Sequence, residues 1–268
     1  MSRLDRRGLF RGVAGFGAAT ALPAAAQPAP QATPPVAAPA APPAGSVAAW
    51  RAGSREVQPV SSWRFLNAPE AAFLDAAVDR IIPPDDQWPG ARWAGVVRYI
   101  DQSLAGAHGQ GARFYAAGPW APGLPTQGYQ LPLNPAQLYR TSLTAILREA
   151  EARQLDFARA APAAQDAFLR AIEAGEVDCG GFRSDVFFET FLANTIEGFL
   201  SDPEYGGNRD MVGWRMIGFP GAHAAYLPLY THHGMKYDEE PLPMGETARH
   251  QHTPGQGHGR PQGESRRG

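Results

Sequence analysis

Apolar residues recur at helical spacing through the middle of the chain. The first stripe follows Asn67 and comprises Phe73, Leu74, Ala77, Val78 and Ile81. Residues that repeat every three or four positions share one face of an α-helix, so this stripe predicts an amphipathic helix. Asn67 is expected to cap its start, with Glu70 three residues later, and Pro83 and Pro84 are expected to end it.

The same spacing predicts further helices over residues 91–104, 134–157, 162–174 and 183–200. The last of these is apolar on three faces and is therefore expected at the centre of the fold. A long loop rich in glycine, proline and aromatic residues separates the second and third helices. No alternating strand pattern of useful length is present. The predicted fold class is all-α, a compact helical domain with long loops.

The N-terminus has the pattern of an export signal. Arg6 and Arg7 precede a weakly apolar stretch rich in glycine and alanine, and a small-residue cleavage site follows at residues 24–26. This arrangement is typical of a twin-arginine signal peptide, here residues 1–26. The alternative is a basic N-terminus followed by alanine-rich disorder. The twin-arginine route exports folded proteins, often with a cofactor or a partner attached.

The composition of the remaining segments predicts their organisation. Residues 27–49 are mostly proline and alanine, carry no charge and predict an extended linker. Residues 50–241 are expected to form the helical domain. Residues 242–268 are rich in glycine and contain histidines, and they predict a disordered tail.

The net charge, the cysteine count and the motifs of the sequence exclude several classes of function. The 268 residues carry a formal net charge of −2, which gives no electrostatic basis for nucleic-acid binding. The single cysteine, Cys179, excludes an internal disulfide and a cluster held by several thiolates, and favours a buried thiol or one that faces a partner chain. No dinucleotide-binding, P-loop, haem-attachment or zinc-protease motif occurs in the predicted domain. The chain is therefore expected to hold no cofactor of its own.

Other polar residues carry weaker signals. Asp75 and Asp79 lie one helical turn apart, and Asp85 and Asp86 follow that helix. Such carboxylates serve acid–base chemistry or bind cations, but a solvated helix face and a turn use the same residues. The histidines lack the spacing of a metal site, since His232 and its neighbour point apart and the others are scattered.

The densest group of chemically capable side chains is FLSDPEYGGNRDMVGWRMIGFPG, residues 199–221. Gly206, Gly207 and Asn208 tolerate positive φ angles, so a tight turn is expected there. Trp214 is one of several large apolar side chains held on this turn. An aromatic surface shaped by glycines is typical of a permanent interface, although a lid over a substrate pocket would use the same residues.

This segment closely resembles the signature of the gluconate 2-dehydrogenase subunit 3 family, also called the small or gamma subunit. The segment FLDAAVDRIIPPDDQWPGARWAGVVRYIDQSLAG, residues 73–106, is also similar to that family. The GPW tripeptide at residues 118–120 and the twin-arginine leader fit as well. The likeness extends from about Phe65 to Tyr237.

The resemblance implies a non-catalytic subunit of a periplasmic FAD-dependent dehydrogenase complex at the outer face of the inner membrane. In such complexes a large flavoprotein of the glucose-methanol-choline type holds FAD and oxidises the substrate, and a multihaem cytochrome c subunit passes electrons from its haem c groups to quinone. The small chain is addressed to the twin-arginine export machinery, and it stabilises and co-exports the flavoprotein. The resemblance assigns to the partner interface Trp120, Tyr205, Gly206, Gly207, Asn208, Arg209, Asp210, Trp214 and Phe219.

Two other hypotheses remain open on the residues alone. One is a self-sufficient periplasmic enzyme or metal-binding protein that uses Asp202, Glu204, Arg209 and His223. It requires activity or bound metal in the isolated chain. The other is a substrate-binding module with the long aromatic loop as its pocket.

Overall fold

The fold is that of a computed structural model, which describes residues 62–114, 117–121, 123–124, 127–128, 130–222, 233–234 and 240–245. These residues belong to one of the two units into which the chain divides, Ala44–Gly268. The predicted signal peptide, the linker, Arg6, Arg7 and His223 lie outside the described residues.

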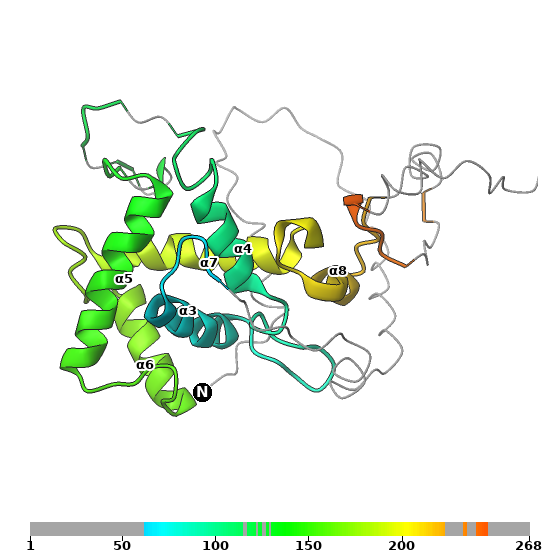
Figure 1. Ribbon diagram of the computed structural model, residues 1–268, viewed down its shortest axis with the longest axis horizontal. Coiled ribbons are helices and arrows are strands. Elements are labelled where there is room, and N and C mark those ends of the chain that lie inside the picture. Colours follow the sequence, from blue (N-terminus) through cyan, green and yellow to red (C-terminus); the bar gives the residue numbers. More distant parts are fainter. Residues whose placement is uncertain are drawn as a thin grey trace, which may run out of the picture. The chain divides into compact units, whose positions relative to one another are not determined.

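Six α-helices and two short 3₁₀ helices make up the described part, where the only strand-like features are two isolated bridges (Figure 1). The elements are α3 (Ala68–Ile81), α4 (Val96–Ala105), α5 (Pro135–Ala152), α6 (Pro162–Glu173), α7 (Ser184–Leu200), η3 (Pro203–Tyr205), η4 (Arg209–Met211) and α8 (Val212–Ile217). The all-α prediction is confirmed. No helix within these residues is both long enough and apolar enough to cross a membrane.

Two helix starts follow directly from their capping residues. The side chain of Asn67 accepts a hydrogen bond from the Glu70 amide at 3.0 Å, and the Glu70 carboxylate accepts one from the Asn67 amide at 2.9 Å. Asn134 and Gln137 form the same reciprocal box at the start of α5. Each box satisfies two backbone donors that the first helical turn leaves free, which fixes where the helix begins.

The start of one helix and the end of another differ from the prediction. Gly95 has a left-handed φ of 80°, so α4 begins at Val96 and residues 91–95 form a turn. At the end of α5, Gln154 has a φ of 55° and the Leu155 amide donates to the Ala150 carbonyl at 2.9 Å. This left-handed cap ends the helix five residues before Phe157.

Helix α7 lies at the centre of the described residues, as its apolar faces predict. It packs against α3, α4, α5, α6 and α8. Phe187, Phe191 and Phe199 are at most 1% exposed, and the ring of the buried Tyr139 meets that of Phe187 at 5.2 Å. Residues 201–222 follow the C-terminal end of α7 and form the candidate functional site.

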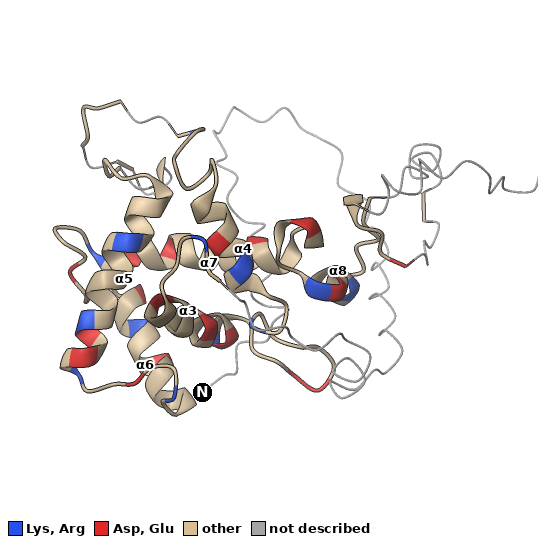
Figure 2. Ribbon diagram, in the orientation of Figure 1, with Lys and Arg blue, Asp and Glu red and all other residues tan. Residues whose placement is uncertain are grey.

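Charged residues of both signs are interspersed along the helices, as Figure 2 shows for α5 and for the region of α8. Some charges hold the fold from inside. The buried carboxylate of Asp101 accepts the backbone amides of Arg64, Phe65 and Leu66, each at 2.9 Å. The segment that leads into α3 is thereby fixed to α4.

Candidate functional site

The segment after α7 folds back on itself as η3, η4 and α8. Gly206 has a φ of 99°, and Asn208 has a φ of 47°. Both adopt the left-handed backbone that the sequence predicts for this turn. Gly207 is outside that region, and a different constraint explains its lack of a side chain.

Close contacts, two with backbone and one with a tyrosine ring, favour glycine at three positions. A Cβ atom on Gly207 would lie 2.0 Å from the Gly198 carbonyl oxygen, and one on Gly213 would lie 2.0 Å from that of Phe199. A Cβ on Gly198 would lie 2.7 Å from the Tyr99 ring. The turn and α4 therefore pack directly on the backbone of the last turns of α7.

Asn208 joins the end of α7 to the start of α8. Its side chain is fully buried; it donates from Nδ2 to the Ser201 carbonyl at 2.8 Å and accepts from the Gly213 amide at 2.7 Å. A buried main-chain group without a partner costs roughly 1–3 kcal/mol. Asn208 thus holds the turn together.

The turn is also fixed to the residues that precede α4. The Arg209 amide donates to the Ala94 carbonyl at 3.0 Å, and the Arg209 guanidinium lies over the Trp93 ring, 5.6 Å from its centroid. Burial lowers the pKa of Arg209. The charge of Asp210 partly opposes this lowering.

Residues 240–245 form a strap across the turn. The Asp202 carboxylate accepts the Glu204 amide at 3.0 Å and the Met244 amide at 2.8 Å. Leu242 accepts from the Ala222 amide at 2.8 Å and donates to the Pro220 carbonyl. Leu242 and Met244, at the start of the predicted tail, thus form hydrogen bonds with the turn, and residues 246–268 lie outside the described residues.

The residues assigned to the interface divide into a buried framework and an exposed surface. Trp214 is only 5% exposed and donates from Nε1 to the Leu200 carbonyl at 2.7 Å. Tyr205 and Phe219 are 51% and 44% exposed, and the Phe219 ring stands edge-on to Trp214. Trp120 is exposed in the loop between α4 and α5, which Figure 1 draws well apart from α8.

A groove with a volume of about 700 Å³ opens beside Tyr205, and we call it the η3 groove. It is lined by Arg64, Tyr99, Gln102, Ser103, Glu197, Leu200, Ser201, Asp202, Glu204 and Tyr205. The Gln102 amide, oriented to satisfy both of its neighbours, donates to the Tyr205 carbonyl at 3.2 Å and accepts from Arg98 at 3.0 Å. Helix α4 thereby supports the backbone that carries the exposed Tyr205 ring.

A chain of polar side chains leads from the core to this groove. The buried Tyr139 hydroxyl donates to Asn194 at 2.8 Å, and Asn194 donates to Glu197 at 3.0 Å. Tyr99 reaches the same Glu197 oxygen at 3.5 Å. Burial, and then the charge of Glu197, raises the pKa of Tyr99 and, more strongly, of Tyr139. These hydrogen bonds could not be predicted from the sequence, where only the three-residue spacing of Asn194 and Glu197 is visible.

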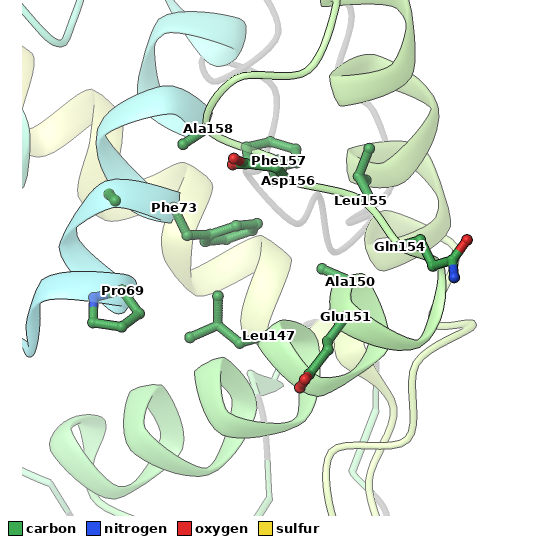
Figure 3. A pocket seen from close by; sticks show the side chains of 11 residues that line it. Pro69, Phe73, Leu147, Ala150, Glu151, Gln154, Leu155, Asp156, Phe157 and Ala158 are labelled. Carbon is green, nitrogen blue, oxygen red and sulfur yellow. The ribbon is translucent and has the colours of Figure 1, made fainter.

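A second hollow, of about 440 Å³, lies between the start of α3, the end of α5 and the loop that follows α5 (Figure 3). Its inner wall is the hydrophobic core itself, because Phe73 and Phe157 are 2% and 4% exposed and their ring centroids are 4.6 Å apart. Glu151 and Gln154 lie at its edge and point away from the two rings (Figure 3). This hollow shares no residue with the η3 groove.

The carboxylates of α3 hold the turn before α4. Arg92 forms an ion pair with Asp75 at 2.6 Å, and its backbone amide donates to Asp79 at 3.0 Å. Burial raises the pKa of Asp75, which Arg92 partly opposes. Cys179 is fully buried, and burial raises the pKa of its thiol. The contacts with Arg92 support a structural role for Asp75 and Asp79. The burial of Cys179 supports the interpretation of a buried thiol.

The metal-binding hypothesis finds no support among the described residues, where no group of three or more histidine, cysteine, aspartate or glutamate side chains could hold an ion. The carboxylate of Asp202 is engaged by two backbone amides. His223 lies outside the described residues.

Comparison with known families identifies one match. The model of the gluconate 2-dehydrogenase subunit 3 family matches residues 68–221, from the first residue of α3 to the end of the folded-back turn. No curated protein and no solved structure matches the chain.

Proposed function

The chain belongs to the gluconate 2-dehydrogenase subunit 3 family, and from this premise we propose that it is the non-catalytic small subunit of a periplasmic, membrane-associated FAD-dependent dehydrogenase. The family name makes it a subunit of a dehydrogenase complex. The observation that carries the proposal is the extent of the match, which covers all six described helices and ends with the turn of residues 201–221.

In this proposal the chemistry resides in the partners. A large flavoprotein of the glucose-methanol-choline type carries FAD and oxidises the substrate, and a multihaem cytochrome c subunit accepts the electrons. This chain binds the flavoprotein through the surface around Tyr205 and Phe219. The exposure of these aromatic side chains on a rigid, hydrogen-bonded framework supports that role.

The export step of the proposal rests on the leader. Arg6 and Arg7 direct the chain to the twin-arginine machinery. Because this machinery moves folded proteins, a flavoprotein that lacks its own signal can cross the membrane while it is bound to this chain.

The test replaces the two arginines conservatively. In the chain's own host, the Arg6→Lys and Arg7→Lys double variant is compared with the wild type by fractionation and by flavin absorbance. We expect both the chain and the flavoprotein to leave the periplasmic fraction together. A flavoprotein that reaches the periplasm as before would contradict co-export, and an exported chain that never co-purifies with a flavoprotein would contradict the complex.

A further inference from the structure

The η3 groove presents a carboxylate that is held in place from one side. Both hydrogen bonds to Glu197 end on Oε2, from Asn194 at 3.0 Å and from Tyr99 at 3.5 Å. No described residue donates to Oε1. An exposed glutamate normally samples many rotamers, and fixing one lowers the entropy lost when the carboxylate binds a ligand. The chain of polar groups from Tyr139 thus preorganises one free carboxylate oxygen at the surface.

A second carboxylate lines the same groove. The backbone of Glu204 is fixed because its amide donates to Asp202 at 3.0 Å. Its side chain is exposed, and no described residue forms an ion pair with it. Asp202, by contrast, is buried and already accepts two backbone amides. Glu197 and Glu204 are therefore the two carboxylates available to a ligand.

The other lining groups suit a planar cation. Two tyrosines, Tyr99 and Tyr205, and the apolar Leu200 also line the groove. Aromatic faces and carboxylates together bind a guanidinium, which stacks on the rings and donates paired hydrogen bonds. The lining holds three carboxylates but only one basic residue, Arg64, so its net charge is negative and disfavours an anionic ligand.

We propose that the η3 groove receives an arginine side chain, together with the short stretch of backbone that carries it, from the large flavoprotein subunit. This inference rests on the proposed function and specifies the chemistry of its interface. A volume of about 700 Å³ exceeds what one side chain fills, which is why neighbouring residues of the partner are included. Tyr205, on the rim, contacts that segment.

The first test measures binding in the native host. The tagged chain is purified with the Glu197→Gln and Glu204→Gln double substitution, and flavin absorbance per tagged chain is measured over a range of salt concentrations. Each substitution keeps the side-chain size and removes the charge. We expect about a tenfold weaker association, with a smaller salt dependence, as is typical for the loss of charge-assisted hydrogen bonds.

A matched control separates the groove from general effects of charge. Glu189 is exposed on α7, outside the groove lining. The Glu189→Gln variant should bind the flavoprotein like the wild type, and all variants should keep the wild-type melting temperature. If the double variant captures as much flavoprotein as Glu189→Gln does, the groove proposal is wrong while the subunit assignment stands. If the wild type captures none, both fail.

The second test identifies the occupant. The Tyr205→p-benzoylphenylalanine variant is irradiated in the assembled complex, and the cross-linked peptide is sequenced by mass spectrometry. A peptide of the large subunit with arginine next to the cross-linked residue supports the proposal. A cross-link within this chain, for example to residues 50–61, or to a segment without arginine, overturns it.

Discussion

Asn208 meets two structural requirements, one through its backbone and one through its side chain. Its backbone is left-handed, with a φ of 47°, and its side-chain amide hydrogen-bonds the partly buried Ser201 carbonyl at 2.8 Å and the buried Gly213 amide at 2.7 Å. Asparagine tolerates this backbone better than most residues do. Glycine would tolerate it too, but it has no side-chain amide to form the two hydrogen bonds. The same side chain therefore defines both the turn and its packing against α7.

Replacing Asn208 by alanine should lower the free energy of unfolding by about 2–4 kcal/mol, because the Ser201 carbonyl and the Gly213 amide lose their partner. Asn208→Asp keeps the acceptor for Gly213 but buries a carboxylate whose second oxygen faces the Ser201 carbonyl, so its effect should be at least as large as that of alanine. Urea denaturation of the purified chain measures both. Equal, near-zero effects would show that the amide does not hold the turn.

Cys179 and Tyr139 should lower the free energy of unfolding at alkaline pH. Burial raises the pKa of both groups in the folded chain, so the unfolded chain loses these protons first. The free energy of unfolding should therefore decrease as the pH rises above the ordinary thiol value of 9.0, by at most about 1.4 kcal/mol per pH unit for each proton.

Below that pH both groups are protonated in both states and contribute no pH dependence. Cys179→Ala should flatten the decrease that begins near the thiol value. Urea denaturation at a series of pH values checks this, and a variant with the wild-type pH profile would contradict it.

At the scale of elements, sequence predicts best where a local signal is complete. The start of α3 is predicted from Asn67 and Glu70 alone. The turn after α7 is predicted from Gly206 and Asn208, which adopt the left-handed backbone. The helix predicted over residues 91–104 begins too early, because its apolar stripe includes Trp93 whereas the left-handed Gly95 delays the helix to Val96. A stripe records which residues face the core, and it does not record whether their backbone is helical.

One buried ion pair joins α3 to α5. The Glu70 carboxylate is 2% exposed and pairs with Arg140, which also donates to the Phe65 carbonyl. Arg140→Leu leaves that carboxylate buried and unpaired, so it should lower the free energy of unfolding by about 3 kcal/mol, the lower part of the range for such pairs, since Arg140 is partly exposed.

Two variants control this prediction. Glu70→Gln combined with Arg140→Leu should recover part of the loss, because no charge then remains buried. At the C-cap of α5, Arg153→Leu removes an exposed pair with Glu149 and a contact with the Phe168 ring, and it should cost only about 1 kcal/mol. Chemical denaturation of the variants measures these differences, and equal losses for Arg140→Leu and Arg153→Leu would contradict the assigned burial.

At the scale of the whole molecule, the sequence indicated which segment matters but not which of its residues face outward. Trp214 and Phe219 are similar in sequence terms, yet only Phe219 is exposed. The strap of residues 240–245 was missed because its order comes from hydrogen bonds to Asp202 and Pro220, more than twenty residues away in the chain. The η3 groove combines α4, α7 and η3, which no local pattern brings together.

Substitutions of the buried residues should affect folding, and substitutions of the exposed residues should affect assembly with the partner. Trp214→Ala removes a buried ring and should destabilise the chain by about 3–5 kcal/mol. The Tyr205→Ala and Phe219→Ala double variant should leave stability within about 1 kcal/mol and instead reduce the flavoprotein recovered with the chain. Melting temperature and recovered flavin, measured on the same samples, distinguish the two effects. A stable double variant that recovers a full complement of flavoprotein would remove this surface from the interface.

The most direct test of the central claim is to purify the wild-type chain, with a C-terminal tag, from its own host and to record the absorbance spectrum and subunit content of the eluate. A co-purifying large subunit with flavin bands, in near-equal amount to this chain and with dehydrogenase activity absent from the chain alone, is the predicted result. A colourless chain without a partner, or an isolated chain that is itself active, would contradict the assignment as a non-catalytic subunit.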